Sequence, residues 1–240
     1  MKIFCALFIS IQTLTTAFSQ VVTFSGSDPG AVEGGARPNS ASAAAAFNTA
    51  AGALGFVSTI NFEALTLGQF SSRTLASGVT ASQVGYDTGI GGIMTSGYAT
   101  PVGAPTGFNT TPGGAKFLGF VPTLNIGTAT LDFAFSTPIQ AWGAYIVGLE
   151  SSVAGTVNLQ FDDGSLNSFP LQDLSPAGVQ YFAFTDPGRS IVHVTLVETG
   201  ITGTRDIFGV DDLSYVVVPE PATAALLCLG CATILMRRRA

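Results

Sequence analysis

The chain has 240 residues, of which 47% are hydrophobic and 10% are charged, and its 15 acidic against 9 basic residues give a formal net charge of −6. A nucleic-acid-binding surface needs clustered Lys and Arg, so this balance argues against nucleic acid as a partner. The length suits one domain with a segment at either end.

The first residues have the pattern of a secretory signal. Lys2 precedes an apolar stretch from Ile3 to Leu14, and Ala17-Phe18-Ser19 places small residues at the positions that a signal peptidase inspects. The stretch is too short to span a bilayer permanently. We therefore predict a signal helix over residues 1–19, cleavage after Ser19 and an exported protein.

Residues 20–56 are expected to form an N-terminal extension with one short helix. Asn39 or Ser40 is a suitable helix cap, and the alanines that follow favour a helix. Gly52 and Gly55 are expected to end it.

From residue 57 to 217 the apolar and polar residues mostly alternate, which is the period of a half-buried strand. Strands are expected at 57–62, 130–135, 141–149, 156–161, 165–171, 181–185, 191–197 and 210–216. Asp163-Gly164 predicts a hairpin, Thr137-Pro138 predicts a turn, and the Gly-, Thr- and Pro-rich stretch 85–114 predicts long loops. About nine or ten short strands with frequent turns indicate a mainly β fold, an antiparallel β-sandwich.

The C-terminal residues form three successive parts. Val218-Pro219-Glu220-Pro221 comes first, and its two prolines would break a helix. An apolar run from Ala222 to Met236 follows, which is at the short end for a transmembrane helix. Arg237, Arg238 and Arg239 come next, and positive residues stay on the cytoplasmic side, so the domain is expected outside.

These three parts, in this order, resemble the PEP-CTERM sorting signal of Gram-negative bacteria. The resemblance covers residues 218–240 and implies an exosortase, an integral-membrane enzyme, as the processing partner. It also implies a membrane-anchored precursor that is cut and delivered to the cell surface or extracellular matrix. In some families the same tail is named as the C-terminal region of ice-binding proteins.

The three cysteines, Cys5, Cys228 and Cys231, all fall in the two segments that we expect to be removed. The remaining domain therefore has no disulfide. It keeps 14 of the 15 acidic residues, all except Glu220, and five basic residues, which gives a net charge of about −9.

The sequence offers no convincing catalytic set. His193 is the single histidine and alternates with apolar neighbours, as a structural or surface strand residue would. No serine lies in a Gly-x-Ser-x-Gly elbow. Paired carboxylates remain formally possible with Glu63, Glu150, Glu198 and the aspartates. Trp142 and Tyr145 fall on opposite faces of one strand, and Trp142 is expected in the core.

A second resemblance lies in Ile60-Asn61-Phe62-Glu63-Ala64-Leu65 and in Phe208-Gly209-Val210-Asp211-Asp212-Leu213-Ser214-Tyr215. These stretches resemble the opening and closing strands of galactose-binding-like jelly-roll domains, in which a calcium ion often clips the first strand to the last. The resemblance implies a calcium site made by Glu63 with Asp211 or Asp212. Neighbouring strand residues point to opposite faces, so one aspartate side chain is expected to reach the ion.

Three functions follow from these patterns. The favoured one is a non-enzymatic surface or matrix protein that either binds glycans, such as extracellular polysaccharide, or builds the extracellular layer. The second is a secreted polysaccharide hydrolase on the same sandwich. The third, ice binding, would need a flat threonine array, which Thr110-Thr111, Thr123, Thr128 and Thr130 do not make.

Overall fold

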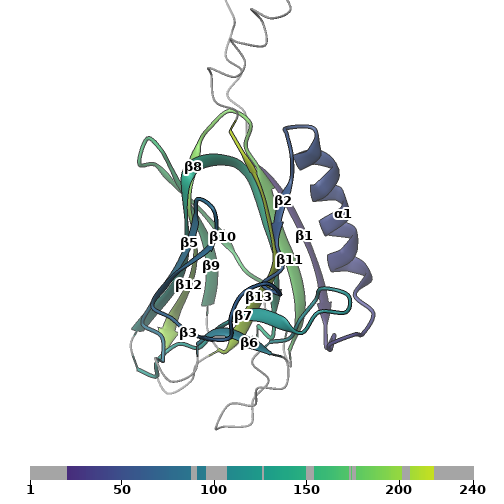
Figure 1. The fold of residues 1–240 in the computed structure, drawn as a ribbon, viewed down its shortest axis with the longest axis vertical. Coiled ribbons are helices and arrows are strands. Elements are labelled where there is room, and N and C mark those ends of the chain that lie inside the picture. The colour runs from purple at the N-terminus through teal and green to yellow at the C-terminus, as the bar shows by residue number, and fades with distance from the viewer. Residues whose placement is uncertain are drawn as a thin grey trace, which may run out of the picture.

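The computed structural model describes residues 21–87, 91–95, 107–125, 127–149, 154–172, 174, 177–201 and 206–218. Thirteen strands and one helix lie in this part of the chain, and all strand pairs are antiparallel. The strands form two layers with the apolar core between them (Figure 1). The predicted antiparallel β-sandwich with one short helix is therefore confirmed for the described residues.

The first layer contains six strands, one of them shared with the second layer. Side by side, they are β4 (Ser72–Ala76), β5 (Val79–Val84), the first half of β8 (Gly127–Val147), β12 (Ile191–Ile201), β9 (Ala154–Phe161) and β10 (Leu166–Pro170). The β9–β10 pair is the hairpin predicted from Asp163-Gly164, and Gly164 has the positive φ (80°) that such a turn needs.

The second layer contains the remaining strands. In order, they are β1 (Val22–Pro29), β11 (Gly178–Thr185), the second half of β8 and β13 (Phe208–Val217). The far edge of β13 pairs with two strands, β2 (Ser58–Ile60) and β7 (Lys116–Phe120). β6 (Gly92–Thr95) and then β3 (Gly68–Gln69) follow β7. The strand predicted at 57–62 is present as the shorter β2, and the stretch expected as loops at 85–114 includes β6.

Strand β8 joins the two layers. The sequence predicted two strands with a turn at Thr137-Pro138, whereas the structure has one strand of 21 residues that arches from one layer to the other (Figure 1). Its first half pairs with β5 and β12, and its second half pairs with β11 and β13. Pro138 donates no backbone hydrogen bond, so the ladder is interrupted there and the strand bends instead of reversing.

The centre of the core lies between the two halves of β8. Trp142 is fully buried, and its ring lies 6.1 Å from that of Phe133 in the first layer and is stacked on Phe184 of β11 at 6.0 Å. Rings of this size contribute the largest apolar areas of a core. Trp142 is thus a core residue, as predicted, and Tyr145 lies on the opposite face of β8.

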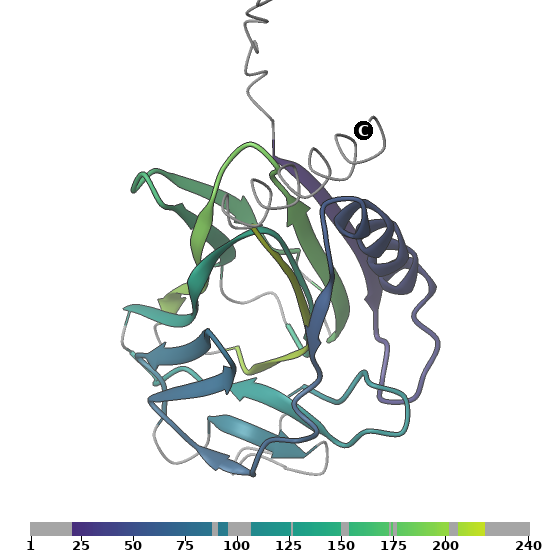
Figure 2. The same ribbon diagram turned by 45° about the horizontal axis from the view of Figure 1, so that its top comes forward.

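Helix α1 (Pro38–Gly52) covers the outer face of the second layer (Figure 2). Phe47 is fully buried against Tyr181 of β11 and Phe24 of β1, each with ring centroids 6.0 Å away. The helix is where the sequence predicted it, but Asn39 and Ser40 lie inside it and neither is the cap, because the N-cap position is Arg37. The Asp28 carboxylate, at the end of β1, accepts from the backbone N–H groups of Asn39 (3.0 Å) and Ser40 (2.8 Å).

The expected signal helix over residues 1–19 and transmembrane helix over residues 222–236 lie outside the described residues. Within the described part of the chain, no helix has the length and apolar character to cross a membrane. Pro219, Glu220, Pro221 and Arg237 to Arg239 also lie outside it. Val218 is described, and its backbone N–H donates to the Pro138 carbonyl at 2.8 Å.

Candidate functional site

Glu63 follows β2 at a sharp change of chain direction. Phe62, just before it, has a φ of 62° and is buried, an unusual backbone conformation for a bulky residue. The Glu63 carboxylate accepts hydrogen bonds from Asn109 Nδ2 (2.8 Å) and from the backbone N–H groups of Ala115 (2.9 Å) and Lys116 (2.8 Å). Glu63 therefore anchors both ends of the loop 109–115.

Asp211 and Asp212 lie in β13 at a β-bulge. Asp211 is opposite Tyr145 and Ser214 is opposite Gly143, so three steps along β13 match two along β8. Asp212 has a φ of 48°. The expectation that the two aspartates point to opposite faces is therefore wrong, because the bulge adds a residue and breaks the alternation of the strand.

Both aspartates reach the same loop. Asp211 Oδ2 accepts from the Thr110 backbone N–H (2.5 Å), Thr110 Oγ1 (2.9 Å) and the Thr111 backbone N–H (3.2 Å). The Asp212 carboxylate accepts from Thr111 Oγ1 at 2.6 Å, and its second oxygen lies 3.0 Å from Thr110 Oγ1. The three acids thus converge on one loop, with Glu63 at its ends and the aspartates beneath Thr110 and Thr111.

The Thr110 hydroxyl lies between the two aspartate side chains. A threonine hydroxyl has one hydrogen, yet Thr110 Oγ1 lies within hydrogen-bond distance of one oxygen from each aspartate. Both contacts are satisfied when one carboxyl is protonated. Burial, together with the neighbouring Asp212 charge, raises the pKa of Asp211 to about 7.

The structure does not decide whether the three acids bind calcium. Among the described residues, no group of three or more His, Cys, Asp or Glu side chains could hold a metal ion. Oxygens of Glu63, Asp211 and Asp212 accept hydrogen bonds from donors of the loop, and calcium would have to displace some of these donors. Calcium binding stays a prediction of the sequence that a thermal measurement decides.

A cleft of about 490 Å³ lies beside this loop. One wall comes from residues 33–37, before α1, and the other from residues 109–114. The lining residues are Glu33, Gly34, Gly35, Arg37, Asn109, Thr110, Thr111, Pro112, Gly113 and Gly114. The volume falls in the range that small-molecule sites occupy, about 300–1,000 Å³.

Arg37 fixes the two walls relative to each other. Its guanidinium donates to the Thr110 carbonyl and lies over the ring of Tyr145, 5.2 Å from the ring centroid. Burial raises the pKa of Tyr145, and the nearby Arg37 charge opposes that shift. No carboxylate of the described residues forms an ion pair with Arg37.

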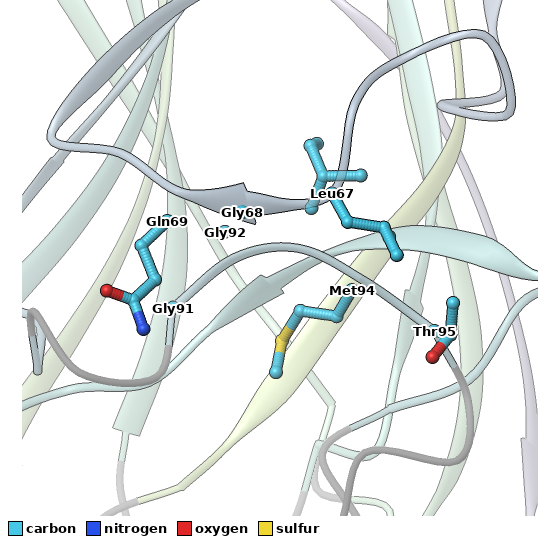
Figure 3. A pocket seen from close by; sticks show the side chains of 8 residues that line it. Leu67, Gly68, Gln69, Gly91, Gly92, Met94 and Thr95 are labelled. Atoms are coloured by element: carbon cyan, nitrogen blue, oxygen red, sulfur yellow. The ribbon is translucent and has the colours of Figure 1, made fainter.

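Two other hollows differ from this cleft. The one between β3 and β6 is mainly apolar, with Leu67 and Met94 at its rim, and its 180 Å³ is below the usual size of a ligand site (Figure 3). A more open groove of about 620 Å³ runs between β1 and α1 and has no charged lining residue; Ser42 and Gln172 are among its polar ones. Neither hollow touches the predicted acids.

The other candidate residues have structural surroundings. His193 Nδ1 lies 2.9 Å from Asp132 Oδ2 on the neighbouring strand, on the outer side of the first layer. Glu198 is buried, and its carboxylate accepts from the Asp206 backbone N–H at 2.9 Å. Glu150 lies outside the described residues.

The sequence did not indicate Arg37, Glu33 or Asn109. Arg37 belongs to a segment expected as an extension, and its contact with Tyr145 joins residues that no pattern relates. Thr110-Thr111 with Pro112-Gly113-Gly114 was recognised only as loop. One signal could have indicated this loop. Its backbone N–H groups need acceptors when they are buried, and nearby carboxylates can supply them.

The sequence matches no protein-family model and no curated protein. Among solved structures, the fold resembles the enzymatically active domain of tailspike protein 4 of bacteriophage CBA120, with 13% identity and a TM-score of 0.35. That match covers 59% of this chain and 20% of the tailspike chain, so this chain spans about a fifth of its length.

Two carbohydrate-binding modules also have similar folds. The family 29 module CBM29_1 from Piromyces equi is 10% identical over 68% of this chain and 90% of its own, with a TM-score of 0.37. The family 11 module of the cellulase Lic26A-Cel5E from Clostridium thermocellum is 11% identical over 68% and 95%, with a TM-score of 0.27. Likenesses this distant establish no ligand for this chain.

Proposed function

We propose that this chain is an exported, non-enzymatic surface or matrix protein whose sandwich binds a glycan in the cleft beside Arg37. The observation that carries the proposal is the cleft itself, a hollow of ligand size with a guanidinium, amide, hydroxyl and carboxylate groups on two walls. Such groups match a hydroxyl-rich ligand. The walls are held in place by Arg37 and the acids, so little ordering is needed on binding.

The carboxylates next to the cleft favour binding over hydrolysis. A glycosidase needs an acid that reaches the glycosidic oxygen and a second carboxylate that faces the sugar. Asp211 has a raised pKa but no exposed surface, and the loop engages its oxygens. The alternative, a polysaccharide hydrolase, is tested by incubating the protein with each bound glycan and measuring released reducing ends, of which we expect none.

A glycan array followed by titration tests the binding site. Arg37→Gln removes the charge and the contact over Tyr145, and we expect it to weaken binding roughly tenfold or more. Ser42→Gln, in the groove between β1 and α1, is the matched control and should bind like the wild type. Equal affinities of the wild type and Arg37→Gln would place the ligand elsewhere, and an array with no binding would favour a scaffold role.

The second part of the proposal is that the segment from Val218 to Ala240 is an exosortase sorting signal. Its support is the order of its parts, since Val218 directly follows the last strand and the prolines keep the next residues out of the sheet. Changing Pro219, Glu220 and Pro221 to alanine should leave the protein in the membrane. The intact mass of surface material should lack both Met1 and Arg239, and normal release of the variant would contradict the proposal.

A further inference from the structure

Exposed apolar side chains gather at one end of the second layer, the end at which β1 begins and β13 finishes. We name this the tail end. Phe56 is 84% exposed, Val22 is 51% exposed and Val217 is 43% exposed. A phenylalanine so fully exposed is unusual because most large rings in a domain of this size are buried.

Strand register places these three residues at the same end of the layer, with β11 and β8 between Val22 and Val217. Val22 is opposite Thr185, Thr185 is opposite Ala141, and Ala141 is opposite Val216, so they form one row across four strands. On the far side of β13, Tyr215 is opposite Ser58, which sets Phe56 level with Val217. A Cβ added to Gly55 would lie 3.1 Å from Val216, so the chain just before Phe56 lies against the end of β13.

The chain itself limits how far this end can lie from the apolar tail. Three residues, 219–221, separate Val218 from the apolar run that starts at Ala222. An extended chain advances at most about 3.5 Å per residue, so the four steps from Val218 to Ala222 span at most roughly 14 Å. With the apolar run in a bilayer, the tail end therefore lies at the headgroup region.

The charged residues at the tail end leave the second layer free to approach the headgroup region. Asp186 and Arg189, which follow β11, form an ion pair at 2.8 Å and cancel each other. The acidic turn with Asp162 and Asp163 lies at the same end but in the first layer, because Phe161 is level with Ile191 and Ile139. Val217 is opposite Ile139 in the same row, so strands β8 and β12 separate it from β9 and the acidic turn.

We propose that Phe56, Val22 and Val217 contact the membrane surface in the anchored precursor and hold the domain with its tail end down. The inference rests on the proposed function because it requires the apolar run that starts at Ala222 to insert into the membrane. Aromatic and aliphatic side chains next to a membrane-inserted segment gain by entering the interfacial region. The domain is acidic overall, so the lipid surface that suits it is zwitterionic rather than anionic.

Quenching by brominated lipid tests the contact in the full-length chain. Phe56→Trp puts a reporter at the tail end, and Val32→Trp puts one at the opposite end, where Val32 is 65% exposed. The native Trp142 is buried and its emission is subtracted with the wild type. In vesicles of phosphatidylcholine and brominated phosphatidylcholine, the Trp at position 56 should lose most of its emission and the Trp at position 32 should lose almost none.

The failures of the two proposals are distinguishable by vesicle flotation. A chain that floats with the vesicles while the Trp at position 56 stays unquenched overturns the membrane contact and leaves the tail anchor standing. A chain that does not float contradicts both. An emission shift at position 56 that appears without vesicles and grows with protein concentration would assign the surface to a second copy of the chain, and this also overturns the proposal.

Discussion

Glu198 is an acid whose charged form is disfavoured by the fold. It is 2% exposed, one carboxylate oxygen has no partner, and burial raises its pKa from 4.5 to about 7. Below pH 4.5 the group is protonated in both the folded and the unfolded chain, so folding carries no penalty. As the pH rises from 4.5 to 7, the unfolded chain loses the proton first and the folded state becomes less stable.

We therefore predict that Glu198→Gln removes part of the pH dependence of stability. The amide keeps an oxygen for the Asp206 N–H and cannot ionise. Between pH 4.5 and pH 7, the unfolding free energy of the wild type should fall by up to about 3 kcal/mol relative to that of the variant. Above pH 7 the difference should stay constant. Urea unfolding of both proteins across this range measures it. A difference that does not change with pH would show that Glu198 ionises freely in the fold.

The acids beneath the cleft give a second prediction at this scale. Asp211 holds the loop through Thr110 and Thr111, so Asp211→Ala should leave buried N–H groups without an acceptor and cost about 3 kcal/mol of unfolding free energy. Chemical unfolding of the wild type and the variant measures the loss.

Thermal unfolding of the wild type and of Asp211→Ala decides the role of calcium. Equal melting temperatures with calcium and with a chelator would contradict a calcium site at these carboxylates. A rise with calcium that Asp211→Ala abolishes would instead support the site predicted from the sequence, since an ion that binds only the folded chain stabilises it.

Among the elements, those with a local signal were predicted and those fixed by distant partners were not. The alanine run determines α1, and Asp163-Gly164 determines the β9–β10 hairpin. Strand β1, in contrast, is a short polar segment whose pairing with β11 joins residues that lie far apart in the sequence. The bulge at Asp212 and the bend of β8 also depend on neighbouring strands, because register belongs to the pair and not to one sequence.

The candidate site shows the same division. The sequence selected Glu63, Asp211 and Asp212, which do meet at one loop. It missed Arg37 and the loop residues, because the contacts between Arg37 and Thr110 join segments without any periodic pattern.

The contact between β1 and α1 is so close at Gly26 that adding one methyl group there tests it. A Cβ on Gly26 would lie 2.3 Å from the Asn39 carbonyl oxygen, which is backbone and cannot move aside alone. Gly26→Ala should therefore push the start of α1 away from β1 and cost about 1–3 kcal/mol of unfolding free energy.

Gly52→Ala is the matched control, because nothing lies within 4 Å of its added Cβ and alanine is the better helix residue. Urea unfolding of both variants gives the comparison. Equal stability of Gly26→Ala and the wild type would mean that α1 is not packed on Gly26.

At the scale of the whole molecule, the cleft and the tail end lie at opposite ends of the sandwich. Strand β1 runs from the exposed Val22 at the tail end to Pro29, close to the wall that contains Arg37 (Figure 1). Its eight residues span roughly 26 Å. Helix α1 runs back in the other direction. A domain that stands on its tail end therefore presents the cleft away from the membrane.

This arrangement predicts that membrane attachment leaves glycan binding unchanged. A glycan identified on the array should bind the full-length chain with the same Kd in zwitterionic vesicles and in detergent, because the cleft is open to solvent in both. Arg37→Gln should weaken glycan binding equally in vesicles and in detergent. Isothermal titration of both proteins in both settings measures this. A large loss of affinity for the wild type on vesicles alone would show that the membrane covers the cleft, and would contradict the orientation derived from Phe56 and Val217.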